Sequence, residues 1–250
     1  DYRAYFSADF VEPDARVVAI VFTDEALIQL EKRSPLPRDV IASALRALDK
    51  MNPKAIGIDI LFDQPQTEDA DLIDALRNMK TPVSVAYANI GTNQDDIKKQ
   101  QQEYLEEFLS QLKGSNSHPS SIRLDAAFGQ TRVWPSIEEE LPPVLGRSMV
   151  ADSGESVALC EGYEGAIDYR RSLYEDQSQS GELQEGDQAD ASQPLFTGLD
   201  VSLFVDPDPE FVLPFLAEQI EGKYVLIGAE LVDVDRKEVP FTSLDGVEPA

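Results

Sequence analysis

Acidic residues stand inside or just beyond apolar segments that have the composition of buried β-strands. Asp24 follows the run VVAIVFT, Asp59 lies within GIDILFD, Asp63 ends that segment, and Asp235 follows a late apolar run. In an open parallel sheet, ligands gather beyond the carboxyl ends of the strands. Carboxylate oxygens are the ligands that Mg²⁺ and Ca²⁺ prefer, so a cation site at that edge is one interpretation of the pattern.

A structural interpretation of the same acids involves Arg38. A carboxylate within a strand must be paired, because an isolated charge is very unfavourable in a low-dielectric interior. We predict that Asp59 chiefly pins the first helix by pairing with Arg38, and that Asp59→Ala costs about 3–5 kcal/mol of stability. Both interpretations stay open, and the candidate ligand-binding residues are Asp24, Arg38, Asp59, Asp63 and Asp235.

Other signals of catalysis are few, and we expect no catalytic residue. The single histidine, His118, falls in the stretch SNSHPSS, which predicts a loop with a solvated side chain. The single cysteine, Cys160, excludes an intrachain disulfide and is expected to pack as a small apolar residue. The sequence has no nucleophile elbow and no phosphate-cradling glycine loop. A metal-dependent hydrolase that uses Asp24, Asp63 and Asp235 stays open as an alternative.

The charge of the chain restricts its partners. There are 21 Lys and Arg against 47 Asp and Glu, a formal net charge of −26. Such a surface repels phosphate backbones and anionic lipid heads, so neither nucleic acid nor a lipid surface is an expected partner. No apolar run approaches the roughly 20 residues of a membrane helix. Because the sequence opens at Asp1 without Met or a leader, we expect an excised domain of a longer protein.

Hydrophobic periodicity in the first third of the chain alternates between strand and helix. Short joints between such elements imply right-handed parallel crossovers. The predicted fold class is therefore α/β, with a mostly parallel central sheet covered by helices on both faces and a long irregular insertion in the middle. The predicted strands are Val17–Phe22, Ala55–Phe62 and Val83–Tyr87, and the predicted helices are Val40–Met51, ended by Asn52-Pro53, and Asp69–Met79.

The remainder of the chain is less regular. A polar helix is predicted over Asp95–Lys113, a short helix between Trp134 and Leu145, and a buried strand over Lys223–Ala229. The stretch Tyr174–Pro194 lacks apolar periodicity, which predicts a disordered acidic loop. We expect one domain over residues 1–250, with a βαβαβ core over 14–90, the helical and irregular insertion over 91–165, the acidic loop over 174–194 and the C-terminal part of the core over 195–246.

Several short stretches occur together in a set order. The first three are an apolar strand ending in an acid (VVAIVFTDEAL), a proline-rich segment with an arginine (SPLPRDV) and a strand with an internal acid (PKAIGIDILFD). The last three are an acidic helix start (TEDADLIDAL), a Gly-Lys-x-Val-Leu-Ile-Gly strand (GKYVLIGAE) and an Asp-led segment (DRKEVPFTSLDG). Together they resemble the CHASE type-two family of sensory extracellular domains associated with cyclases and histidine kinases. The chain differs at Leu36, Lys237 and Val239, where that pattern has Trp, His and Thr.

The resemblance implies an extracytoplasmic sensor domain without catalysis of its own. It implies membrane attachment through flanking helices that this chain lacks, and an output domain that is an adenylyl or guanylyl cyclase or, otherwise, a histidine kinase. The family's acids and arginine fall on Asp24, Arg38, Asp59 and Asp235. The expected signal is a small molecule or ion, no cofactor is expected beyond Mg or Ca at the acids, and a homodimer is expected in the full-length receptor. A ligand-free dimerisation module is a further alternative.

Overall fold

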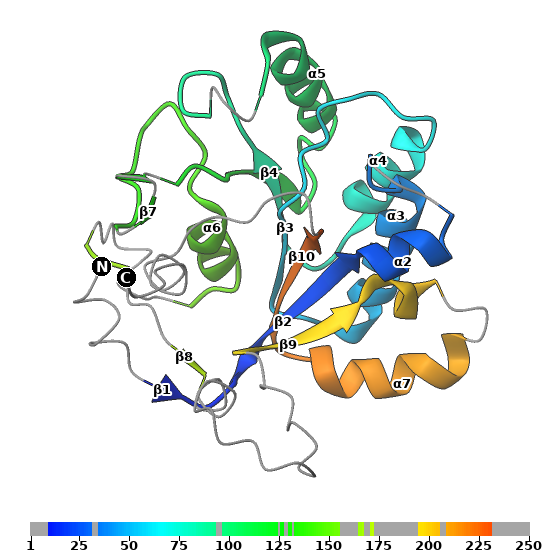
Figure 1. Cartoon of the computed structure of the whole chain (residues 1–250). Helices are drawn as coiled ribbons and strands as arrows, with labels where there is room; N and C mark the ends of the chain where they lie inside the picture. The colour runs from blue at the N-terminus through cyan, green and yellow to red at the C-terminus, as the bar shows by residue number, and fades with distance from the viewer. Residues whose placement is uncertain are drawn as a thin grey trace, which may run out of the picture.

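The computed structural model describes residues 10–31, 35–93, 97–124, 126–127, 130–131, 133–155, 165–167, 171–172, 195–205 and 209–231. Their centre is a six-stranded sheet in the order β5-β4-β3-β10-β2-β9, in which each neighbouring pair is parallel (Figure 1). The strands are β2 (Asp14–Thr23), β3 (Ala55–Ile58), β4 (Val83–Tyr87), β5 (Ser117–Ser121), β9 (Phe196–Asp200) and β10 (Tyr224–Glu230). The α/β class predicted from the sequence is confirmed.

Helices cover both faces of this sheet. Figure 1 shows α3 and α4 on one side of the strands and α6 on the other. The helices are α2 (Asp24–Gln29), α3 (Arg38–Leu48), α4 (Asp69–Asn78), α5 (Lys99–Ser110), α6 (Leu145–Asp152) and α7 (Pro209–Ile220), with 3-10 turns η1 (Asp49–Met51) and η3 (Val201–Phe204). Two short pairs lie outside the sheet: parallel β1 (Phe10–Val11) with β8 (Arg171–Ser172), and antiparallel β6 (Ala126–Ala127) with β7 (Gln130–Thr131).

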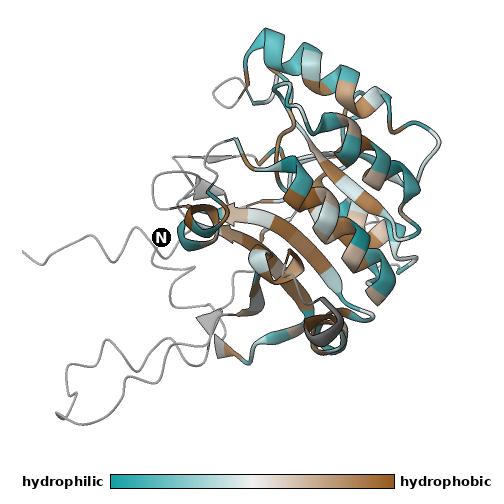
Figure 2. Ribbon diagram, turned by 90° about the vertical axis from the view of Figure 1, so that its right-hand side faces the viewer, coloured by the Kyte–Doolittle hydropathy of each residue, from teal (hydrophilic) through white to brown (hydrophobic). Residues whose placement is uncertain are grey.

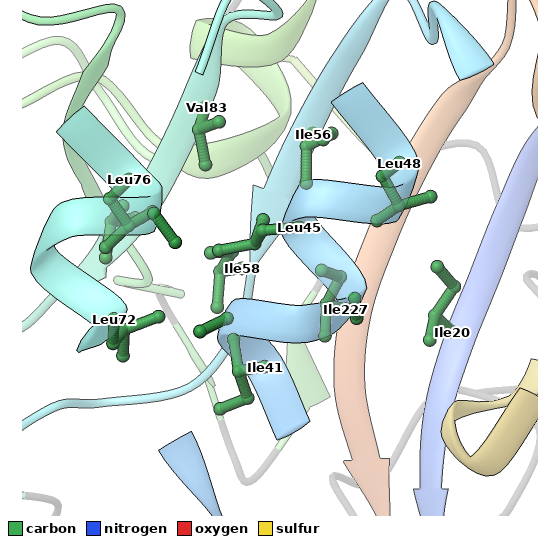
Figure 3. Close-up of a cluster of buried hydrophobic side chains, with 14 of the residues drawn as sticks. Ile20, Ile41, Leu45, Leu48, Ile56, Ile58, Leu72, Leu76, Val83 and Ile227 are labelled. Atoms are coloured by element: carbon green, nitrogen blue, oxygen red, sulfur yellow. The ribbon is translucent and has the colours of Figure 1, made fainter. Parts of the chain in front are cut away.

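The main core lies between the sheet and α3 and α4. Figure 3 shows Ile41, Leu45 and Leu48 of α3 beside Leu72 and Leu76 of α4, facing side chains of four strands. These helical residues are fully buried, and each such side chain contributes about 1.5–3 kcal/mol on burial. In Figure 2 the strands are brown, whereas the covering helices carry teal on their outward sides. The helical spacing of apolar residues therefore places these helices as the sequence predicts.

The order of the strands separates two segments that follow one another in the sequence. β10 lies between β2 and β3 and pairs in parallel with both, over Tyr224–Glu230 with β2 and Tyr224–Ile227 with β3. The late apolar segment is therefore a central strand, which agrees with its nearly continuous hydrophobic sequence. As a consequence, the carboxyl ends of β2 and β3 lie two strand spacings apart, or about 10 Å.

Two local predictions are wrong. The stretch SNSHPSS contains β5, which pairs with β4 through residues 117–121, so it is not a loop. One of its buried serines is satisfied by a neighbouring helix, since Ser117 Oγ donates to the Leu76 carbonyl at 2.6 Å, and such a bond helps a polar edge strand to form. No helix occurs over residues 133–144, because α6 begins only after Pro142-Pro143. The predicted acidic loop over 174–194 lies outside the described residues.

Gly57 of β3 allows α6 to approach the sheet closely. A Cβ atom at Gly57 would lie 2.5 Å from Met149 Sδ and 3.0 Å from Leu226 Cδ2. Met149 belongs to α6, is buried, and is part of the contact between that helix and β3. The glycine in the GIDILFD segment is thus explained by packing, since any larger residue would have to displace the side chains of Met149 and Leu226.

We expect Gly57→Val to destabilise the domain by about 1–3 kcal/mol, the usual cost of overpacking a filled core. Gly198→Val is the matched control, because Gly198 also lies in a strand and a Cβ there meets nothing within 4 Å. Urea unfolding of both variants measures the difference. Equal stability of the two variants would show that α6 does not pack tightly on β3.

Candidate functional site

Of the acids identified from the sequence, Asp24, Asp59 and Asp63 lie at the carboxyl edge of the sheet, but they are spread along it. Asp24 is the first residue of α2, directly after β2, and is half-buried. Asp59 is exposed directly after β3, where its backbone N–H donates to the Ile227 carbonyl at 2.8 Å. Asp63 lies further along the same loop, and Asp235 lies outside the described residues. Because β10 separates β2 from β3, Asp24 and Asp59 stand on either side of a third strand.

Arg38 is the buried charge of this edge. It is the first residue of α3, and its side chain is only 2% exposed. The guanidinium forms an ion pair with Asp69, and its Nη2 donates to the Gln64 carbonyl at 2.5 Å. The carbon at its centre lies 5.2 Å from the ring centroid of Phe62 and 5.4 Å from that of Phe108. Aromatic faces and a carboxylate thus surround a charge that water does not reach.

Asp69 is held in place by several donors. It is the first residue of α4, where the helix dipole favours a negative charge. Its Oδ2 accepts a hydrogen bond from the backbone N–H of Gln66 at 3.0 Å and another from the hydroxyl of Tyr104. These bonds satisfy the Oδ2 oxygen of the carboxylate, whereas its Oδ1 oxygen forms the ion pair with Arg38. The ion pair is therefore part of a network rather than an isolated contact.

Helix α5 contributes two hydrogen-bonding side chains to this network. Tyr104 contributes the bond to Asp69, and Gln101 Nε2 donates to Asp63 Oδ2. Phe108, from the next turn of α5, packs against Phe62 with ring centroids 5.0 Å apart. One buried guanidinium and its neighbours therefore connect α3, α4, α5 and the loop between β3 and α4.

The electrostatics of the network follow from burial. Removal of water lowers the pKa of the Arg38 guanidinium below its ordinary value, while Tyr104, Asp63 and Glu68 act in the opposite direction. Arginine stays protonated in proteins, so the charge must be compensated where it lies. The arrangement is suited to hold the carboxyl edge of β3 in one conformation, and it contains no nucleophile with an adjacent base.

The structure brings together some of the predicted residues and separates others. Arg38 and Asp63 share one network, whereas Asp59 is exposed, so the prediction of a buried Asp59–Arg38 pair is wrong. Asp59 follows β3 instead of lying inside it, because the strand ends at Ile58. The expected cost of Asp59→Ala therefore falls from about 3–5 kcal/mol to about 0–1 kcal/mol, the range for exposed polar interactions.

Asp69 is the partner that sequence reasoning did not identify. The signal was present in the acidic helix start TEDADLIDAL, since an acid at the first position of a helix is well placed to meet a group at the start of a neighbouring helix. Tyr104 and Gln101 carried no comparable signal, because they appear as ordinary members of a polar helix. Among the described residues, no group of three or more His, Cys, Asp and Glu is arranged to hold a metal ion.

His118 lies on the opposite face of the sheet from this network and has a partner. Its Nε2 is 2.8 Å from Asp152 Oδ2, at the end of α6, and Ser84 Oγ donates to the same oxygen at 3.2 Å. The prediction of a loop at His118 is therefore wrong, because the residue lies in β5, while its side chain is 39% exposed and also has a partner. The trio ties β4 and β5 to α6, which is a structural role that a single sequence does not reveal.

The described residues thus form an α/β domain with a buried arginine network at the carboxyl edge of its sheet. The sequence matches the CHASE2 domain family over residues 1–249, and the chain belongs to that family. CHASE2 domains are extracellular sensory domains found in receptors. Searches against curated proteins and against solved structures give no match. No helix in the described ranges is long and apolar enough to cross a membrane.

We expect Asp69→Ala to destabilise the domain by about 3–5 kcal/mol, because it leaves the Arg38 charge buried without its carboxylate. Asp71→Ala is the matched control: Asp71 also lies in the first turn of α4 and is ion-paired, to Arg46 at 2.6 Å, but both side chains are largely exposed. Such a pair contributes about 0–1 kcal/mol. Denaturant unfolding of both variants provides the comparison, and equal losses would contradict the buried network.

Proposed function

We propose that this domain is the signal input of a membrane-bound receptor, placed outside the cytoplasmic membrane, whose output is an adenylyl or guanylyl cyclase or, otherwise, a histidine kinase. Membership of the CHASE2 family supports this proposal, because it makes the domain a receptor component. On this view the chain is held by flanking membrane helices and performs no reaction itself. The acidic surface, with a net charge of −26, is compatible with a domain that faces the aqueous side of the membrane.

The proposed signal is a small molecule or ion that binds at the carboxyl edge, near Asp24, Asp59 and Asp63, with Mg²⁺ or Ca²⁺ as candidate ions. Asp235 stays a candidate ligand from the sequence alone, because it lies outside the described residues. A ligand transmits a signal only if it has different affinities for two arrangements of the domain. The Arg38 network supplies an element that such a ligand could bias. A ligand that competes for Asp63 would release Gln101, and so remove one of the contacts that hold α5 on the loop after β3.

A homodimer is the proposed assembly of the receptor, and one surface favours it. β9 forms an edge of the sheet among the described strands, and its first residue, Phe196, is 45% exposed. The turn η3 continues from β9 and contacts α7, on which Phe215 is 63% exposed. Large apolar side chains at an open sheet edge are typical of interaction surfaces. A second copy of the chain would cover both.

The output is tested on the complete protein that contains this domain, expressed in membranes. We expect the membranes to form cyclic AMP from ATP or cyclic GMP from GTP; transfer of phosphate to a histidine identifies the kinase instead. Gln101→Ala is expected to change the activity by about fivefold, the effect of one hydrogen bond of about 1 kcal/mol.

Gln100→Ala is the control for that experiment, because Gln100 is the exposed neighbour of Gln101 on α5. The absence of both cyclic nucleotide and phosphohistidine would contradict the proposed receptor. Equal activities of the Gln101→Ala and Gln100→Ala receptors would contradict the proposed coupling through α5.

The proposed dimer is tested by analytical ultracentrifugation of the 250-residue chain over a range of concentrations. Phe215→Ser is expected to weaken self-association by about thirtyfold, the effect of a central aromatic residue that contributes about 2 kcal/mol. Ile28→Ser is the control, since Ile28 is 75% exposed but lies on α2, at the carboxyl edge. A chain that stays monomeric, or equal effects of both substitutions, would contradict this interface.

A further inference from the structure

A second cluster of buried charge lies beyond the carboxyl end of β5. Ser121 ends that strand, and its backbone N–H donates to the Pro143 carbonyl at 2.9 Å, so the chain returns beside β5 just before α6 begins. Between them is a cavity of about 30 Å³, lined by two arginines, Arg123 and Arg147, and by Glu138. It is separate from the Arg38 network, which lies where α3, α4 and α5 meet.

Both arginines are buried, with exposed fractions of 7% for Arg123 and 4% for Arg147. Arg123 Nη2 donates to the Ser136 carbonyl at 2.5 Å, and Arg147 Nη2 donates to the Pro135 carbonyl at 3.1 Å. The guanidinium groups thus come from different elements, one after β5 and one in α6, and they meet the same loop. A site with two buried guanidinium groups is suited to an anion.

Glu138 shows which kind of anion the site accepts. Its carboxylate forms an ion pair with Arg123 and borders the cavity, while the Glu138 side chain remains 44% exposed. A carboxylate from the surface of the chain therefore already reaches a buried guanidinium. Because the glutamate is partly exposed, its side chain can move into solvent when a competing carboxylate takes its place at the buried arginine.

The rest of the lining fits a small, mostly apolar molecule. Ile137, Leu141 and Pro142 border the cavity together with the charged groups. The first turn of α6 borders it as well. The N-cap residue of that helix, Val144, offers no side-chain cap, so the partial positive charge of the helix start favours an anion nearby. The cavity is larger than the roughly 10–15 Å³ that one water needs, so it has room for a carboxylate with a short alkyl group but not for a large head group.

We propose that this cavity binds the carboxylate of a small aliphatic monocarboxylic acid, and that Glu138 is an internal competitor for the same position. The ligand's carboxylate replaces that of Glu138 at Arg123, and its alkyl group lies against the apolar lining. The physiological meaning of the site rests on the proposed sensing function, to which it adds a ligand class. Binding itself is measured on the 250-residue chain without any output domain.

The test is calorimetric titration of the chain with sodium acetate and sodium propionate, against sodium chloride and sodium sulfate at equal ionic strength. Glu138→Gln is expected to bind acetate about fivefold more tightly than the natural chain, because the competitor's charge is removed. Glu139→Gln changes the net charge equally at the exposed neighbouring residue, and it should bind as the natural chain does. Arg147→Lys should bind at least about tenfold more weakly, through loss of a planar donor pair.

Absence of saturable acetate binding to the Glu138→Gln chain would overturn the proposal. So would equal affinities of the Glu138→Gln and Glu139→Gln chains, or sulfate binding as tight as that of acetate. If Arg147→Lys loses the native circular dichroism spectrum, the two glutamine variants decide the matter, since both residues are exposed. A negative result here leaves the cyclase and kinase assays unaffected, so the two proposals fail separately.

Discussion

The burial of the Arg38 charge is the constraint on which the arrangement of α3, α4 and α5 depends. A guanidinium that is 2% exposed needs a carboxylate beside it, and Asp69 provides it from the first turn of α4. Tyr104 then fixes the carboxylate from α5, and Phe62 and Phe108 enclose the guanidinium. Three helices and one loop are therefore placed relative to one another by a single charge, in addition to the apolar packing beneath them.

This constraint suggests how the domain could change conformation when it binds a ligand. Packed cores change conformation between discrete arrangements, and a polar network that joins several elements is a place where a ligand can favour one arrangement. In this chain the network lies at the carboxyl edge of the sheet, where α/β folds bind ligands. The strand order contributes as well, because β10 separates β2 from β3 and distributes the acids along the edge.

The sequence was sufficient to predict the core elements of the fold. Continuous β-branched runs identify β2, β4 and β10 because those strands are buried, and helical spacing identifies α3 and α4 because each has one apolar face. β5 escaped prediction since its residues, Ser117 to Ser121, are mostly polar, and the contact that satisfies Ser117, with Leu76, comes from a distant part of the sequence. Hydrophobic periodicity carries no signal for a strand of this kind.

The candidate site could be predicted only in part, for a related reason. The sequence indicates that Arg38 must be paired, but the choice between Asp59 and Asp69 depends on where β3 ends and on how α4 returns toward α3. A shift of the strand end to Ile58 is enough to expose Asp59. Element boundaries are what sequence patterns fix least well, and a buried ion pair is sensitive to displacements of a few ångströms.

A double-mutant cycle between Arg38 and Asp69 tests the central claim most directly. The free energy of unfolding is measured for Arg38→Met, for Asp69→Ala and for the double variant. The account predicts that the double variant is more stable than the sum of the single losses implies, by about 2–3 kcal/mol, because each single change strands the other partner. Losses that add within about 0.5 kcal/mol would show that the two residues are independent, and would contradict the account.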